Sequence, residues 1–241
     1  MKRSNLDNRS TQKFIIFTED EKSARYYIRD FVKSQNFPLH RIVIVQPENH
    51  VPCGLWEAVQ NAVKQKFVFD DKHKKHTVLK DDIFWLVFDA DKHPKISDTF
   101  NSARQSKIHI GIGFSAICFE IWLMMHFHNK LSQFTCFDAL RKSANFRIYF
   151  PDYDKSNDDV FEKAHSTING ITGSIETAKK YAEQLRKNSR LANPESKHLY
   201  ELNPYCNLNL LFNSIETFFS SQKLSEKENI IKNLQNESFS I

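Results

Sequence analysis

The sequence predicts an α/β fold, in which a largely parallel β-sheet carries helices on both faces and an α-helical C-terminal half follows. Short apolar runs alternate with segments whose apolar residues recur at helical spacing. Uninterrupted apolar runs of this kind are typical of strands buried on both faces. After residue 115 the pattern becomes almost entirely helical. With 241 residues and 40% hydrophobic content, the chain is long enough to form a sizeable core.

Four apolar runs in the first half are predicted strands, and three amphipathic segments between them are predicted helices. The strands are expected at residues 13–18, 41–45, 83–88 and 108–112. The helices are expected at residues 20–34, 54–66 and 97–106. Because strands and helices alternate along the chain, the strands are expected to lie parallel with helices covering both sides of the sheet.

The second half is predicted to be a helical extension packed on the sheet. Its helices are expected at residues 117–128, 135–144, 158–167, 173–188 and 207–220. The expected organisation is an N-terminal tail, an α/β domain, the helical extension and a polar C-terminal tail, with bounds 1–12, 13–128, 129–221 and 222–241. The last segment is charged and rich in Asn, which is consistent with a loosely held helix or with a tail.

The charge of the chain favours some classes of binding partner, and its low glycine content argues against nucleotide-binding loops. The chain carries 34 Lys and Arg against 29 Asp and Glu, and a net charge of +5 favours polyanionic partners without requiring them. Two basic clusters supply candidate nucleic-acid contacts, namely Lys72, Lys74, Lys75, Lys179 and Lys180. Ordinary solvated surface is the equally supported alternative for both. With only 5 Gly, the sequence contains neither a P-loop nor a dinucleotide-binding fingerprint.

Cysteine spacing and the N-terminus predict a cytoplasmic protein. The 4 cysteines form no Cys-x-x-Cys pair, which argues against a structural zinc site. The first residues are polar and do not resemble a signal peptide. The most hydrophobic segment, residues 117–127, is too short to span a bilayer and contains Glu120 and His126. We therefore expect free thiols in a reducing compartment and no membrane association.

Carboxylates follow two of the predicted strands, and they suggest a metal site. Glu19 comes directly after the first strand, and Asp89 and Asp91 follow the third. The carboxyl ends of parallel strands meet at one edge, where ligands bind, and residues i and i+2 of an extended chain point the same way. Oxygen ligands of this kind suit Mg²⁺ or Mn²⁺ in phosphodiester chemistry. The alternative is that the aspartates make turns or cap a helix.

Three segments resemble a known family. Residues 15–27 are similar to the family's opening strand, acidic turn and helix. Val87-Phe88-Asp89-Ala90-Asp91 resembles the strand of that family that ends in Asp-x-Asp. Residues 114–127, with Phe119-Glu120-Ile121-Trp122, resemble a Ser-Asn-Pro-x-Phe-Glu-x-Trp helix start. Together they resemble the Toprim domain of topoisomerases, primases and OLD nucleases, and more specifically the RloB family and the second component of the AbiL abortive-infection system. The resemblance implies a Toprim-like, Rossmann-like sheet.

That resemblance also implies an activity. It suggests a Mg²⁺- or Mn²⁺-dependent nuclease that cleaves DNA or RNA in antiviral defence, with a separately encoded ATPase as partner. Glu19 would be the general acid/base or a metal ligand, and Asp89 and Asp91 would bind the metal. The sequence departs from the family pattern at Asp20, Ala24, Ala116 and Ile117.

Because of these departures, a catalytically degenerate domain that binds nucleic acid or the ATPase is the main alternative. An unrelated phosphotransferase or phosphatase with an aspartate nucleophile is a third hypothesis, although its downstream signature is not evident. Whether the chain forms a homo-oligomer is left open.

Three further side chains belong to the predicted site. Glu120 lies in an apolar segment, so it is expected either to face the carboxylates as a catalytic residue or to pair with an Arg or Lys. Ser115 is expected to cap the following helix, whose amino end is an alternative phosphate site. His93 follows Asp91 by two residues and is a candidate to contact the metal ligands.

Overall fold

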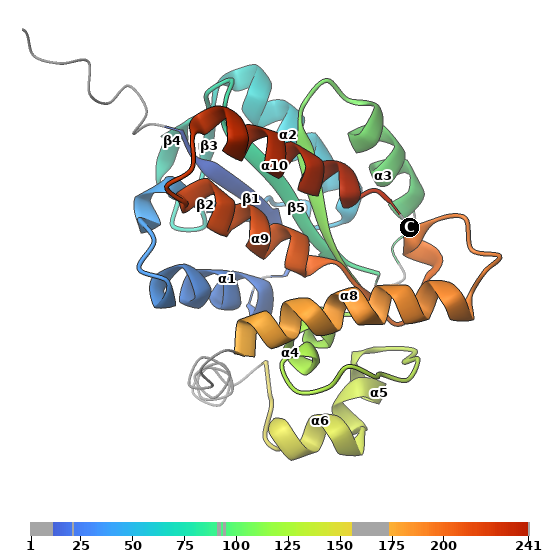
Figure 1. Ribbon diagram of the computed structural model, residues 1–241. Helices are drawn as coiled ribbons and strands as arrows, with labels where there is room; N and C mark the ends of the chain where they lie inside the picture. Colours follow the sequence, from blue (N-terminus) through green and yellow to red (C-terminus); the bar gives the residue numbers. More distant parts are fainter. Residues whose placement is uncertain (1–11, 21, 91–92, 94, 156–173, 241) are drawn as a thin grey trace, which may run out of the picture.

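A five-stranded, mostly parallel sheet organises the chain, as the sequence predicts (Figure 1). The computed structural model describes residues 12–20, 22–90, 93, 95–155 and 174–240. The strand order is β2-β1-β5-β6-β7, and only β7 is antiparallel to its neighbour. The strands are β1 (Phe14–Thr18), β2 (Ile42–Val45), β5 (Ile83–Asp89), β6 (Ile110–Ala116) and β7 (Tyr205–Cys206).

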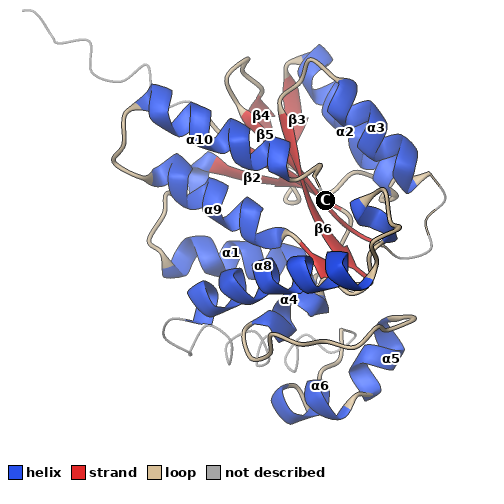
Figure 2. Cartoon of the chain, turned by 45° about the vertical axis from the view of Figure 1, so that its right-hand side comes forward, coloured by secondary structure: helices blue, strands red, loops and turns tan. Residues whose placement is uncertain are grey.

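Helices cover both faces of this sheet (Figure 2). One face packs against α2 (Pro52–Gln65) and α3 (Ile96–Gln105). The core on the other face includes residues from helices in both halves of the chain, namely α1 (Ser23–Ser34), α4 (Glu120–Met125), α5 (Phe137–Lys142), α6 (Ala144–Tyr149), α8 (Ser174–Ala192), α9 (Leu208–Phe219) and α10 (Leu224–Glu237). Short 3₁₀ helices occur at Leu39–Arg41 and Leu199–Glu201. The predicted helix at 158–167 lies outside the described residues.

Side-chain alternation along the buried strands divides the interior into two cores. On β1, Phe14 and Ile16 face the helices that include α1 and α9, whereas Ile15 and Phe17 face α2 and α3. Every residue of β1 is buried, as expected for an internal strand of a parallel sheet. The helical extension therefore shares a core with the sheet rather than enclosing one of its own.

The strand order places a topological switch point between β1 and β5. From β1 the chain passes through α1 to β2 on one side, and it later returns through α2 to β5 on the other side. Ligands of open α/β sheets bind at the carboxyl ends of the strands where the order reverses. In this protein that position is the crevice after Thr18 of β1 and Asp89 of β5.

The segment expected to be a polar tail contains α10, which binds the open edge of β6. Ser238 Oγ accepts a hydrogen bond from the Ile112 N–H at 2.9 Å. Asn207 Oδ1 accepts one from the Phe114 N–H at 2.6 Å. These side chains satisfy backbone groups that β7 is too short to pair. Ile231 of α10 is also buried in the core, so the helix is part of the fold.

Several elements differ from the predicted ones. A hairpin of β3 (Phe67–Phe69) and β4 (Lys75–Thr77) was not predicted. The fourth predicted strand, 108–112, extends instead from Ile110 to Ala116, and the following helix is shortened accordingly to α4. Within the described ranges, no helix has both the length and the apolar character needed to cross a bilayer.

Candidate functional site

Glu19 and Asp89 meet at the switch point, as the strand ends predict. Strands β1 and β5 are neighbours with Thr18 opposite Val87, and the Glu19 N–H continues the ladder to the Val87 carbonyl at 3.0 Å. Glu19 Oε2 accepts a hydrogen bond from the Asp89 N–H at 3.1 Å, and Glu19 Oε1 contacts Nε2 of His93. The predicted contact of His93 with the site is therefore confirmed. Asp91 lies outside the described residues.

Glu120 brings a third carboxylate to the same region, in a fully buried position. Its Oε1 accepts hydrogen bonds from Ser23 Oγ at 2.8 Å and from the Tyr153 hydroxyl at 2.8 Å, and it lies 2.9 Å from Lys155 Nζ. The expectation that this buried carboxylate pairs with a base is confirmed by Lys155. Its other oxygen, Oε2, accepts no hydrogen bond from any residue that the structure describes.

Asp20 completes the cluster and shapes the turn that follows β1. One carboxylate oxygen lies 3.1 Å from Lys155 Nζ. The other accepts the Lys22 N–H at 2.6 Å, which fixes the backbone just before α1. Lys22 Nζ donates in turn to the Lys155 carbonyl at 2.7 Å. Asp20, a departure from the family pattern, therefore anchors Lys155 as well as the turn.

The electrostatics of these groups follow from their crowding. Burial raises the pKa of Asp89 well above its usual value, and repulsion from Asp20, Glu120 and Glu19 raises it further. Burial alone would also raise the pKa of Glu120, but Lys155 and the hydrogen bonds from Ser23 and Tyr153 outweigh it and lower that pKa.

Lys155 responds to the same neighbours in the opposite sense. Burial would lower the pKa of its ammonium, but Glu120 and Asp20 outweigh that effect and raise the pKa. The cluster therefore holds an ion pair between Glu120 and Lys155 next to an Asp89 carboxyl that is costly to ionise.

The donor chemistry of this cluster fits a divalent cation. Among the residues that the structure describes, no three His, Cys, Asp or Glu side chains are arranged to share one ion. However, the repulsion that raises the pKa of Asp89 is the kind that a bound cation relieves, and the donors are hard carboxylate oxygens. Glu19 and Asp89 are the side chains at the switch point that would hold it.

Family comparison covers all of these residues. Residues 14–215 match a family model described as RloB-like protein. The chain belongs to the RloB-like protein family. The matched region includes Glu19, Asp89, Glu120 and Lys155, whereas α10 lies beyond it. No curated protein and no solved structure matches the chain.

In this RloB-like protein, Ser115 and Lys179 are placed differently from the sequence prediction. Ser115 does not cap a helix, because it lies within β6 opposite Asp89, where its Oγ is 3.9 Å from Cys206 Sγ. Lys179 is buried and lies 2.8 Å from Glu176 and 2.5 Å from Glu216. Its charge is thus neutralised within the fold, and we exclude it from the nucleic-acid candidates.

The remaining candidate contacts with nucleic acid are exposed. Lys72, Lys74 and Lys75 lie at the turn of the β3–β4 hairpin, where Asp70 Oδ1 accepts the backbone N–H groups of Lys72 and Lys74. Lys180 is exposed on α8. Further along α8, Lys187 and Arg190 line a cavity of about 400 Å³ beside Tyr205 of β7. This cavity borders the end of the sheet that carries Asp89, because the β7 residue next to Tyr205 pairs with Ser115.

Sequence reasoning missed the residues that hold Glu120, namely Ser23, Tyr153 and Lys155. Ser23 carries no charge, so nothing in the sequence marks it as a partner of a carboxylate. Tyr153 and Lys155 lie in the loop after α6, far from Glu120 in sequence. The one usable signal was Glu120 itself, since a buried carboxylate requires a basic partner somewhere in the chain.

Proposed function

We propose that this RloB-like protein is a Toprim-type, Mg²⁺- or Mn²⁺-dependent nuclease that hydrolyses DNA or RNA phosphodiesters. The observation that carries the proposal is the meeting of Glu19 and Asp89 at the switch point between β1 and β5. Glu120 and Asp20 lie beside them and raise the negative charge of the crevice. Such a site recruits cations and, through them, phosphate groups.

Each side chain has a definite part in this proposal. Glu19 and Asp89 would hold the cation, together with Asp91 as the sequence suggests. The chemistry that a bound cation would supply is polarisation of a phosphate oxygen and a lower pKa for a water molecule. His93 orients the Glu19 carboxylate through its contact with Oε1. Lys155 fixes the positions of Asp20 and Glu120, and it places a positive charge where a phosphate approaches.

Cleavage assays test this activity directly. The wild-type protein should cleave DNA or RNA substrates with Mg²⁺ or Mn²⁺ and should lose that activity in EDTA. Glu19→Gln keeps the size of the side chain but removes its charge, so it should be inactive under every metal condition while unfolding at a temperature close to that of the wild type. Cleavage that persists in EDTA, or in Glu19→Gln, would contradict the proposal.

A second candidate function is a nucleic-acid- or ATPase-binding module that does not cleave. One observation favours it, because the Lys155 ammonium already bridges Asp20 and Glu120 and so supplies a positive charge inside the carboxylate cluster. In that case the wild-type protein would bind nucleic acid or the ATPase, and Glu19→Gln would change neither this binding nor the metal response. Calorimetric titration with Mn²⁺ separates the two functions, since only the nuclease requires a metal site that Glu19→Gln removes.

The cavity beside β7 is the surface on which we expect substrate phosphates to lie. Changing both Lys187 and Arg190 to Gln should weaken nucleic-acid binding, because two phosphate contacts are lost. The slope of the logarithm of the binding constant against the logarithm of the salt concentration should become shallower by about 2. The turnover number should stay within about twofold, since neither side chain belongs to the carboxylate cluster. The matched control changes Lys72 and Lys74 to Gln on the hairpin. An equal or larger effect of the control would place the interface on the hairpin instead.

The resemblance also suggests the cellular setting. We place the activity in the cytoplasm, in antiviral defence, with a separately encoded ATPase as partner. Copurification of the tagged full chain with such an ATPase tests this part, independently of the cleavage assay.

A further inference from the structure

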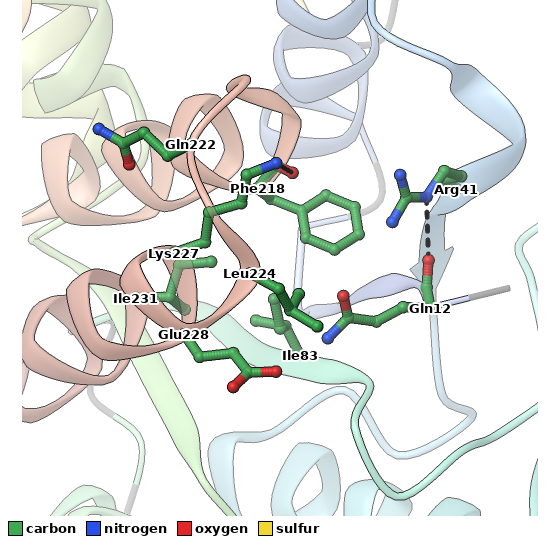
Figure 3. A pocket seen from close by; sticks show the side chains of 9 residues that line it. All are labelled: Gln12, Arg41, Ile83, Phe218, Gln222, Leu224, Lys227, Glu228 and Ile231. Carbon is green, nitrogen blue, oxygen red and sulfur yellow. Dashed lines mark hydrogen bonds between the residues drawn. The ribbon is translucent and has the colours of Figure 1, made fainter. Parts of the chain in front are cut away.

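A small pocket, whose lining side chains are drawn in Figure 3, lies at the opposite end of the sheet from the carboxylate cluster. It has a volume of about 140 Å³ and lies between the start of β5 and the α9–α10 turn. Ile83, which begins β5, lines it, whereas Asp89 ends the same strand. Six residue-to-residue steps of extended chain separate them, or about 20 Å. The pocket is therefore distinct from the proposed nuclease site.

Arg41 is held rigidly at one side of this pocket. Its guanidinium lies over the ring of Phe218 at 4.3 Å and near the ring of Phe219 at 5.6 Å. Its Nε donates a hydrogen bond to the Gln12 carbonyl at 3.0 Å. The two terminal amino groups point away from that carbonyl toward Phe218, as Figure 3 shows, and they bond to none of the described residues. Burial lowers the pKa of Arg41, so its charge lacks full solvation.

Lys227 of α10 brings a second cation to the pocket. Its Nζ donates to the Phe218 carbonyl at 3.3 Å. Burial lowers the pKa of this ammonium, and repulsion from Arg41 lowers it further. Neither cation has a carboxylate within 4.0 Å among the residues that the structure describes, and the exposed Glu228 at the rim pairs with neither. Holding two partly buried cations close together without an anion costs free energy, and a bound anion would remove that cost.

We propose that this pocket binds the phosphate group of a small phosphorylated molecule, such as a mononucleotide. A phosphate monoester carries up to two negative charges, which matches the two cations. The planar Arg41 guanidinium suits phosphate geometry, and stacking on a ring pre-orients it. The exposed amide of Gln222 adds a donor at the rim, while Phe218, Ile83 and Ile231 form an apolar wall for the rest of the ligand.

Calorimetric titration of the full chain in EDTA tests this site, with inorganic phosphate, AMP and adenosine as probes at constant ionic strength. Phosphate and AMP should bind, and adenosine should not. Arg41→Gln and Lys227→Gln should each weaken binding by about tenfold or more, as expected when one charge-assisted contact is lost. Lys232→Gln, which removes an exposed charge from the same helix, should change affinity by less than about twofold. A higher affinity for AMP than for phosphate would show that the apolar wall contributes.

Three outcomes would overturn the proposal. They are no binding of phosphate or AMP by the wild type, equal binding of adenosine and AMP, or wild-type affinity in Lys227→Gln. Lys227→Gln serves as the second variant because Arg41→Gln also loses packing on two aromatic rings. Glu19→Gln should bind AMP as the wild type does, so failure of the nuclease proposal leaves this test intact.

Discussion

Replacing Lys155 with Met should lower the free energy of unfolding by about 3 kcal/mol, because it leaves the buried Glu120 carboxylate without its cation. Losing one member of a buried pair typically costs about 3–5 kcal/mol. We expect the lower end, since the Lys155 side chain is 33% exposed and water can reach part of the vacated space. The same change releases Asp20, which loosens the turn before α1.

Thermal unfolding in EDTA measures this effect. For a chain of this size, each kcal/mol shifts the midpoint by about 2–4 °C, so a decrease of roughly 6–12 °C is expected. Lys142→Met removes an exposed lysine on α5 and should leave the midpoint unchanged within about 1–2 °C. Combining Lys155→Met with Glu120→Gln should recover much of the loss, since the fully buried side chain at position 120 then carries no charge. A double variant as unstable as Lys155→Met alone would contradict this explanation.

The sheet was predictable because most of its strands are short runs of apolar residues that can be recognised in the sequence. Runs such as Phe14-Ile15-Ile16-Phe17 are apolar at every position, and only a strand between two helical layers buries all of them. The end of β6 was not predictable in this way, because Gly111 and Gly113 weaken the strand pattern. Their reason is tertiary, since a Cβ at Gly111 would lie 2.6 Å from Trp85 and one at Gly113 would lie 2.8 Å from Leu208.

The short elements were missed for related reasons. Strands β3 and β4 contain three residues each and flank a charged turn; the apolar run of β3 is too short to indicate a strand, and β4 is polar throughout. Strand β7 has two residues, and its place is set by pairing with the end of β6. The segment of α10 is polar in sequence, and it is anchored in part by Ser238, directly after the helix, whose hydrogen bond to β6 depends on a partner distant in sequence.

The residues of the candidate site also differ in how far the sequence predicts them. The proximity of Glu19 and Asp89 was predictable because strand ends in a parallel sheet converge on one edge, and β1 and β5 are neighbours, so that the Asp89 N–H reaches the Glu19 carboxylate. Lys155 was not predictable, because it belongs to a loop whose course depends on how the helical extension packs. The need for such a residue could be inferred from Glu120, but its position in the sequence could not.

Asp89→Asn should make the metal-free protein more stable while it removes metal-dependent cleavage. Burial and three neighbouring carboxylates raise the pKa of Asp89, so ionising this group in the folded protein costs free energy that Asn does not incur. We expect a gain on the order of 1–2 kcal/mol in EDTA at neutral pH, or a few degrees in unfolding midpoint. Cleavage should fall by about 100-fold or more, because a cation ligand is lost.

The stability difference between Asp89→Asn and the wild type should depend on pH. Because the folded-state pKa of Asp89 lies above the unfolded value, the folded protein binds more protons between those two values. The contribution of Asp89 to stability is therefore fully present below its ordinary pKa, and it is lost as the pH rises through the raised folded pKa. Midpoints in EDTA from about pH 4 to about pH 8 should thus show an advantage of Asp89→Asn over wild type that grows with pH. Asp138→Asn, whose side chain is 66% exposed, should show no such trend.

Adding Mg²⁺ or Mn²⁺ distinguishes a metal site from crowded carboxylates that serve only the fold. A cation that binds only the folded state stabilises the wild type by about 2.7 kcal/mol at 100 times its dissociation constant. Asp89→Asn should respond much less, because a neutral amide is a weaker ligand and no longer needs charge relief. The two stability curves should therefore approach or cross as metal is added at neutral pH. If metal stabilises both proteins equally, the cation binds elsewhere and Asp89 is not its ligand. If Asp89→Asn is less stable than the wild type in EDTA, the carboxylate has a structural role that outweighs its repulsion from Asp20, Glu120 and Glu19.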